Sequence, residues 1–225
     1  MIMKPLRSFL AVLLLVSVTA QGGIYSSGTL NTPILDADPT GISSDIIVSG
    51  SGAVLNNVSV LINVSGGYNG DLTAYLTYNG ILVPLLNRVG TGSGDAIQML
   101  FGYSTAGFDN VRLSDVGSVN IHDAITPGAS PTSYHPDGGN LAAYNGSDPN
   151  GTWTIFFADM ASSGGSSSST LVSWSLDVTA VPEPVNVALG ILAGLCGAVG
   201  LVRSRLVRDR LHRCLVAIVQ WVDAV

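Results

Sequence analysis

The stretch GDLTAYLTYNGILVPLLNR, residues 70–88, decides the fold class. In its first half, residues 72–77, apolar side chains alternate with Thr and Tyr, which is the period of a strand with one buried face. Asn79 and Gly80 both tolerate positive φ, so they favour a tight hairpin turn. Pro84 has no amide hydrogen, so we expect the return strand, residues 81–86, to lie at a sheet edge or to carry a bulge.

The same two-residue period recurs along the chain. It appears in NNVSVLINVSGG (56–67), in NGTWTIFFADM (150–160) and in LVSWSLDVTA (171–180). In the last of these, Trp174 is expected on one face of the strand and Leu171 on the other. Trp153 and Trp174 are interpreted as core residues, with stacking on a sugar as the alternative.

Turn residues separate these runs and helix signals are weak before Pro184. We expect further short strands within residues 96–101, 111–115 and 118–124, and an irregular surface loop over residues 126–150. About eight strands with Gly-, Asn-, Asp- and Ser-rich connections indicate an all-β sandwich or barrel.

The charge of residues 21–184 differs strongly from that of the whole chain. This region holds thirteen acids against Arg88 and Arg112, a balance of −11, whereas the full chain carries −6. Such a domain will not bind nucleic acid through charge, but it suits divalent cations or solubility. We expect Arg88 to pair with an aspartate. The region has no cysteine, so its core, or a metal, must hold it together.

The N-terminus has the pattern of a secretory signal peptide over residues 1–20. Lys4 and Arg7 precede an apolar run, and small residues lead up to Ala20, after which we expect signal peptidase to cleave. The alternative is a membrane anchor, but the apolar run is short for a bilayer. Residues 21–180 then form the β-domain.

The C-terminus has the pattern of a single membrane helix with a basic end. Eighteen mostly apolar residues, 185–202, rise about 27 Å as a helix, close to the hydrocarbon thickness of a bilayer. The basic tail, residues 203–213, would stay in the cytoplasm. Its arginines are Arg203, Arg205, Arg208, Arg210 and Arg213. Residues 214–225 are an extra tail, which either lies on the inner membrane surface or reflects a shifted reading frame.

Several short motifs of the β-domain resemble the P domain (P/Homo B) that accompanies subtilisin-like proprotein convertases. The motifs are Gly70-Asp71-Leu72, residues 85–88 (LLNR), residues 151–159 (GTWTIFFAD) and residues 174–176 (WSL). The resemblance covers about residues 36–179, except for 106–150, and implies a jelly-roll-like sandwich of about eight strands. The catalytic domain that usually accompanies a P domain is not in this sequence.

Aspartates of the β-domain are the candidate metal ligands. Asp71 and Asp159 come first, because each stands beside a strand end, and Asp95 and Asp177 are further candidates. Carboxylates and loop carbonyls favour calcium. The alternative is structural: Asp71 as a turn residue and Asp159 as the cap of a strand.

The end of the chain resembles a PEP-CTERM sorting signal, residues 181–213. Its three parts occur in order: the motif Val181, Pro182, Glu183 and Pro184, then the apolar helix, then the basic tail. In that bacterial family, an exosortase is thought to recognise and process the signal. The resemblance implies export, anchoring in the inner membrane and release to the cell surface or the extracellular matrix. A plain C-terminal anchor is the alternative.

Three functions follow from these patterns. The first is a non-enzymatic surface or matrix protein with extracellular polysaccharide as a partner. The second is an accessory module that acts in trans on a subtilisin-like serine protease. The third is an enzyme, which the sequence disfavours because His122 and His135 belong to no nucleophile–base signature.

Overall fold

The computed structural model describes residues 21–52, 54–128, 133–162, 168–181, 188–197, 199–205, 208 and 212. The chain divides into two units, of which one holds the strands and the other the C-terminal helix. Residues 1–20 with Ala20 lie outside the described residues, as do Pro182, Glu183, Pro184, Arg210, Arg213 and residues 214–225. What the sequence predicts for these segments therefore stays a prediction.

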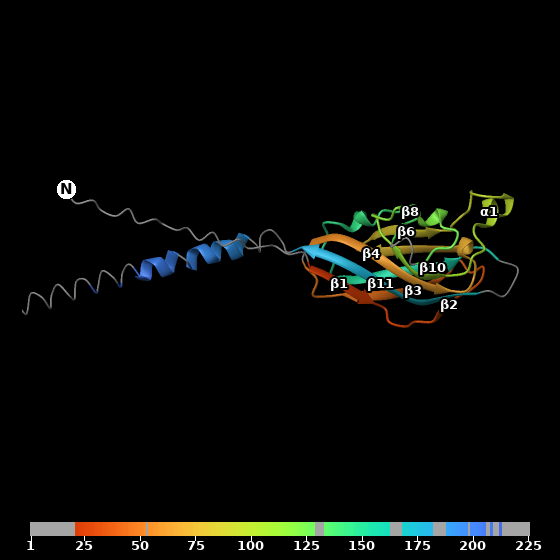
Figure 1. The fold of residues 1–225 in the computed structure, drawn as a ribbon. Coiled ribbons are helices and arrows are strands. Elements are labelled where there is room, and N and C mark those ends of the chain that lie inside the picture. Colours follow the sequence, from red (N-terminus) through yellow and green to blue (C-terminus); the bar gives the residue numbers. More distant parts are fainter. Residues whose placement is uncertain are drawn as a thin grey trace, which may run out of the picture. The chain divides into compact units, whose positions relative to one another are not determined.

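Two sheets form a β-sandwich, which confirms the predicted fold class (Figure 1). The larger sheet runs β1-β11-β4-β7-β9-β8, with β2 also paired to β11, and the smaller runs β3-β10-β5-β6. The larger sheet contains β1 (Gln21–Ser26), β2 (Thr32–Ile34), β4 (Val54–Ser65), β7 (Phe108–Leu113), β8 (Val119–Asn120), β9 (Tyr134–His135) and β11 (Ser169–Val181). The smaller contains β3 (Ile42–Val48), β5 (Leu72–Tyr78), β6 (Ile81–Asn87) and β10 (Gly151–Asp159).

The described residues therefore form eleven strands, against about eight predicted. The short strands β2, β8 and β9 have only two or three residues each. Runs that short show no period, so sequence patterning could not find them. Predicted strands at 111–115 and 118–124 correspond in part to β7 and β8.

The core lies between the sheets and is filled by the alternating positions that the sequence indicated. Trp153 of β10 is fully buried, and its ring stacks on Tyr78 with ring centroids 4.0 Å apart. Tyr144 meets the same indole edge-on at 4.9 Å. The indole N–H donates to the carbonyl of Pro149 at 2.9 Å, so the polar atom of this buried side chain is satisfied. Trp174 is buried as well, so both tryptophans are core residues.

The hairpin of residues 70–88 folds as predicted. Asn79 and Gly80 have φ of 50° and 78°, and β6 is the edge strand of its sheet. The register shifts where Tyr75 pairs with Pro84, so the edge position and the bulge both occur.

The prediction for Leu171 was wrong. Leu171 and Trp174 are both buried on the core face, although they are three residues apart. The register of β11 against β4 shifts between Leu171 and Ser173, and this bulge inserts one extra residue. Beyond a bulge, the side chains of a strand point to the opposite face from the one that simple alternation predicts. The two-residue period of the sequence does not show where such a bulge occurs.

Residues 96–101 form a helix, α1 (Ala96–Phe101), and not the predicted strand. Asp95 caps this helix: its carboxylate accepts from the amides of Ile97 and Gln98, and the Gln98 side chain accepts from the Asp95 amide. This capping box outweighs the β-like composition of the segment.

The described residues of the predicted surface loop, 126–128 and 133–150, include regular structure and buried side chains. Besides β9 they contain the 3₁₀ turn η3 (Leu141–Tyr144), whose Leu141 and Tyr144 belong to the core. The Asp115 carboxylate accepts from the amides that begin this turn. The Tyr144 hydroxyl donates to the Leu76 carbonyl at 2.6 Å. The Gly- and Asn-rich composition of this segment predicted an irregular loop, because composition does not reveal long-range hydrogen bonds of this kind.

The second unit contains a helix, Ala188–Arg205, that is long and apolar enough to cross a membrane by length and composition. The predicted span ended at Val202, but the helix continues through Arg203 and Arg205, because arginine is a good helix former and no breaker intervenes. Arginine near a helix end can extend its charge toward lipid headgroups.

Within the β-domain, the first and last strands are neighbours. Gln21 at the start of β1 pairs with Ala180 near the end of β11, and Val181 pairs with Val54. Both ends of the domain therefore leave the sandwich at one pole, and α1 lies at the other (Figure 1). We call the pole that carries α1 the distal pole.

Candidate functional site

The distal pole is built around the 3₁₀ turn η1 (Asn69–Asp71), which packs against the end of α1. The Gly70 amide donates to the Tyr103 carbonyl at 2.9 Å. A Cβ on Gly70 would lie 2.3 Å from the Phe101 carbonyl oxygen and 2.6 Å from the Tyr103 nitrogen. Only glycine lets the two backbones approach this closely.

Arg88 fastens the same two elements together. Its Nε donates to the Gly70 carbonyl at 3.2 Å and its guanidinium also donates to the Leu100 carbonyl at 3.3 Å. The expected pairing of Arg88 with an aspartate was wrong: the arginine–aspartate ion pair of the described residues is Arg112–Asp177, at 2.9 Å. Carbonyls at the turn and at the helix end offered Arg88 nearer acceptors.

The structure brings the candidate ligands Asp71 and Asp159 together at this pole, because Asp159 pairs with Leu72 across β10 and β5. The two aspartates are 3% and 1% exposed. The Asp159 Oδ1 accepts from the amides of Ala37 at 3.4 Å and Ala161 at 3.2 Å. Its Oδ2 is buried and has no hydrogen-bond partner within the described structure. A buried carboxylate oxygen in this state is costly unless a cation or a proton satisfies it.

Asp36 is the residue at this site that the sequence reasoning missed. Its negative charge acts on Asp159, and its neighbour Ala37 donates to Asp159 from a backbone with φ of 52°. A non-glycine residue in the left-handed region marks a constrained loop. The signal was the turn sequence Asp36-Ala37-Asp38-Pro39.

The other two predicted metal ligands are engaged in structural roles. Asp95 caps α1 and Asp177 pairs with Arg112, whose guanidinium also donates to the Ser59 hydroxyl. The described residues contain no group of three His, Cys, Asp or Glu side chains that could hold a metal ion. Any cation at this pole would therefore need Asp71, Asp159 and carbonyl oxygens.

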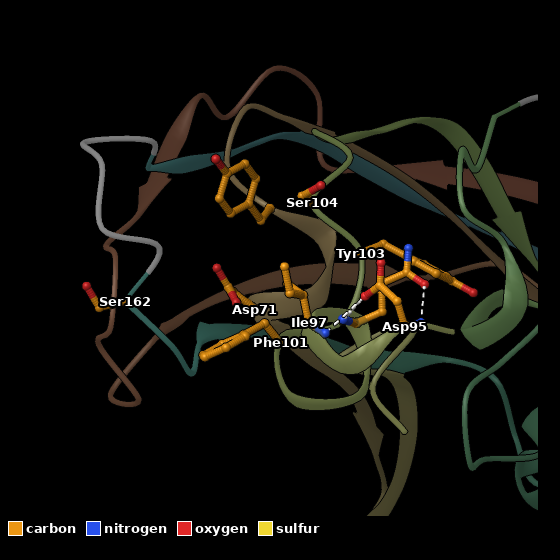
Figure 2. A pocket seen from close by; sticks show the side chains of 10 residues that line it. Asp71, Asp95, Ile97, Phe101, Tyr103, Ser104 and Ser162 are labelled. Carbon is orange, nitrogen blue, oxygen red and sulfur yellow. Dashed lines mark hydrogen bonds between the residues drawn. The ribbon is translucent and has the colours of Figure 1, made fainter. Parts of the chain in front are cut away.

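A pocket of about 510 Å³ opens beside Asp71. Figure 2 shows the side chains of Asp71, Ile97 and Phe101 facing the same space, while Asp95 lies against the helix backbone that it caps. The lining residues are Tyr68, Asp71, Asp95, Ile97, Gln98, Phe101, Gly102, Tyr103, Ser104 and Ser162.

The pKa of Asp159 lies above its ordinary value. Burial is the largest cause, and the negative charges of Asp71 and Asp36 raise the pKa further, while the amides of Ala161 and Ala37 oppose the shift. Because the folded-state pKa exceeds the unfolded-state pKa, the domain binds this proton more tightly when folded. The contribution of Asp159 to stability is present at acid pH and is lost as pH rises through the folded-state pKa.

Asp159→Asn is expected to stabilise the metal-free protein at pH 7, because the neutral amide removes a buried negative charge. The amide oxygen keeps the bonds from Ala37 and Ala161, and no buried negative charge remains. Urea unfolding at pH 7 and pH 4 in EGTA measures the effect, which should shrink at the lower pH. Asp109→Asn, on an exposed position of β7, is the control. A loss of stability at pH 7 would contradict this account.

His122 and Asp137 form an ion pair that the sequence did not indicate. The Asp137 carboxylate lies 2.7 Å from His122 Nδ1, and the Thr91 carbonyl lies 2.8 Å from Nε2. Desolvation lowers the pKa of His122, but the hydrogen bonds to Asp137 and Thr91 and the charges of Asp137 and Asp123 outweigh it, so the pKa is raised. In the protonated imidazole both ring nitrogens donate, and the side chain then joins three loops.

His122→Gln is expected to flatten the pH dependence of stability. The raised folded-state pKa means that the His122 contribution is complete below about pH 6.5 and is lost as pH rises through that folded-state pKa. An ion pair this accessible contributes about 1 kcal/mol or less. Melting temperatures at intervals from pH 5 to pH 9 measure the slope. His135→Gln, which keeps the His122–Asp137 pair, should retain the wild-type slope; an unchanged slope in His122→Gln would refute the assignment.

Comparison with known proteins gives a limited result. No family model matches the chain, and no curated protein matches it. The fold is similar to the crystal structure of a complex between the serine protease of Aeromonas sobria and a chaperone, with a TM-score of 0.41 and 16% identity over 74% of this chain and 28% of that chain. The crystal structure of the serine protease of Aeromonas sobria gives a TM-score of 0.41 and 15% identity, over 73% of this chain and 27% of that chain. This chain spans about a quarter of the length of either.

Proposed function

We propose that the chain is a non-enzymatic exported protein whose β-domain is a binding module on a single-helix anchor. The observation that carries the proposal is the pairing of Gln21 with Ala180. This pairing brings the predicted signal-peptide junction and the predicted sorting motif to one pole. The distal pole, with its pocket and exposed helix, is then free to meet a partner.

The C-terminal segment supports membrane anchoring before processing. An apolar helix follows the last strand, and Arg203 and Arg205 lie at its end, where they would hold the C-terminus in the cytoplasm. The resemblance to a PEP-CTERM signal adds an exosortase as the processing enzyme. The released β-domain would then join the cell surface or an extracellular polysaccharide matrix of a bacterium.

Mass spectrometry of the protein from its native host tests export and processing. The expected mature chain begins at Gln21 and ends near Glu183, with or without an attached group. A full-length chain recovered from the cytosol, with Met1 and Val225 intact, would refute the proposal. A chain that begins at Gln21 and still ends at Val225 would support a plain anchor and exclude exosortase processing.

We further propose that calcium stabilises the distal pole. Asp71, Asp159 and nearby loop carbonyls would hold the ion, and the buried Asp159 Oδ2 without a hydrogen-bond partner is the observation that fits it. Bound calcium would neutralise the carboxylates, which burial otherwise destabilises. At one hundred times the dissociation constant, a ligand specific for the folded state adds about 2.7 kcal/mol.

The calcium proposal is tested by melting the full-length protein in detergent with 5 mM calcium or with EGTA. Calcium should raise the melting temperature of the wild type by several degrees and leave Asp159→Asn unchanged. Asp109→Asn should respond as the wild type does. An equal response of wild type and Asp159→Asn, or no response in either, would rule out this site.

The absence of catalysis is also part of the proposal. Both ring nitrogens of His122 are taken up by Asp137 and the Thr91 carbonyl, so neither is left to activate a nucleophile. A loss of hydrolytic activity on substitution of His122 and His135, in a protein that keeps its fold, would contradict the non-enzymatic assignment.

A second candidate function is that of an accessory module for a separately encoded subtilisin-like serine protease. The resemblance to the P domain motivates it, and the exposed apolar side chains of α1 favour a protein partner at the distal pole. Capture of such a protease from the native host by the wild type, and not by a variant with polar substitutions in α1, would support this function over matrix binding.

A further inference from the structure

Helix α1 presents apolar side chains to solvent. None of its six residues is buried, and Ile97 and Phe101 are 70% and 53% exposed. Met99 and Leu100 are also exposed. An apolar patch of this kind on a soluble domain marks a surface that another molecule covers.

The helix does not depend on burial of these side chains for its position. The Asp95 capping box fixes its first turn, Arg88 holds the Leu100 carbonyl, and the Gly102 amide donates to the Gln98 carbonyl at 2.8 Å. Side chains that are not needed for packing yet stay apolar are available for binding. The backbone that carries them is already organised, which lowers the entropic cost of association.

The pocket next to this patch combines aromatic rings with carboxylates. Tyr68, Phe101 and Tyr103 contribute rings, Asp71 and Asp95 contribute acids, and none of the described lining residues is basic. Rings and carboxylates together attract a cation through the faces of the rings and through direct charge. The volume of about 510 Å³ lies in the range of ordinary ligand sites.

The electrostatic field of the domain favours the same occupant. Residues 21–184 contain thirteen acidic residues and only two arginines, so this region is strongly negative. Arg112 is paired with Asp177, and Arg88 donates to two backbone carbonyls. A positively charged partner would therefore be drawn toward the domain, and more strongly at low ionic strength.

We propose that the pocket receives an arginine or lysine side chain from a partner protein segment whose flanking residues are apolar. The cation enters beside Asp71, between the rings, and the flanking residues cover Ile97 and Phe101 on α1. This proposal goes beyond the exported binding module by naming the chemistry of its partner. It does not require calcium. Because both proposals use Asp71, the peptide is tested in EGTA, so that calcium cannot compete for this carboxylate and the two proposals can fail separately.

The test uses the full-length protein in non-ionic detergent with EGTA and two fluorescent peptides. One peptide is acetyl-Leu-Arg-Leu-amide with a dye, and its twin carries citrulline in place of arginine, which removes the charge and keeps the shape. Fluorescence anisotropy should give binding of the arginine peptide about tenfold tighter than that of the citrulline peptide. Raising the salt concentration should weaken the binding of the arginine peptide alone.

Matched variants locate the site. Phe101→Ser and Asp71→Asn should each weaken binding of the arginine peptide about tenfold. Leu82→Ser, an exposed apolar position on β6, and Asp109→Asn should leave binding unchanged. Because Asp71 is buried, circular dichroism must confirm that Asp71→Asn is folded, and Phe101→Ser, at an exposed position, decides the outcome if it is not.

Equal binding of the two peptides, or equal loss in the control variants, would overturn the proposal. No binding of the arginine peptide up to millimolar concentration would do so as well. If dextran bound at α1 and the arginine peptide did not, the surface would be a polysaccharide site and the proposal would be wrong.

Discussion

Replacing Trp153 with alanine is expected to lower the free energy of unfolding by about 3–5 kcal/mol, the usual cost of removing a fully buried large aromatic side chain. The indole stacks on Tyr78 and meets Tyr144 edge-on, so its loss leaves a cavity bounded by two rigid rings. It also leaves the Pro149 carbonyl without the indole N–H as a donor. Urea unfolding followed by near-ultraviolet circular dichroism measures the loss.

Trp153→Phe separates packing from hydrogen bonding. It keeps an aromatic ring against Tyr78 but cannot donate to Pro149, so we expect a smaller loss, of about 1–3 kcal/mol. If Trp153→Ala cost no more than a surface substitution, about 0.5 kcal/mol, the proposed core would be wrong.

Replacing Gly70 with alanine is expected to cost about 3 kcal/mol, the upper end for an added methyl group in a packed region. The new Cβ would meet backbone atoms of Phe101 and Tyr103, and backbone cannot move aside as a flexible side chain can. The turn η1 and the end of α1 would have to separate. Arg88 could then no longer donate to both the Gly70 and the Leu100 carbonyl, so one of these two hydrogen bonds would be lost.

Gly128→Ala is the matched control, because no atom lies within 4 Å of the Cβ that it adds. Gly70→Ala should also lose both calcium response and peptide binding, since Asp71 follows directly and α1 forms the pocket wall. Unchanged stability in Gly70→Ala would show that the two backbones do not approach as described. Thermal melts of both variants, in EGTA and in calcium, make the comparison.

Much of the sandwich was predictable because its long strands bury one face. The alternation around Val60 and Ile62, the turn at Asn79 and Gly80, and the bulge at Pro84 each follow from local chemistry. Leu171 could not be placed, since a bulge leaves no mark in the two-residue period. Helix α1 could have been found: Asp95 followed three residues later by Gln98 is a capping box in the sequence itself.

The candidate site was predictable only in part, because its members come from distant segments. Asp71 and Asp159 were singled out in the sequence, but the turn sequence at Asp36 does not reveal that this loop lies near Asp159. Local sequence likewise did not reveal that Arg88 donates to backbone carbonyls and not to an aspartate. It also did not reveal the partner of His122, because Asp137 lies in another loop. Local periodicity determines strands, whereas tertiary contacts determine sites.

The position of β11 between β1 and β4 has a mechanical consequence. A pull exerted at Val181 runs along the strand, and the antiparallel ladders on both sides carry bonds perpendicular to it. Sliding β11 out would shear many of these bonds at once, because they cannot open one after another as in a zipper. Rupture under load is governed by the rate of unfolding. If the domain is anchored through Val181, as proposed, the last strand would resist a pull through its ladders with β1 and β4.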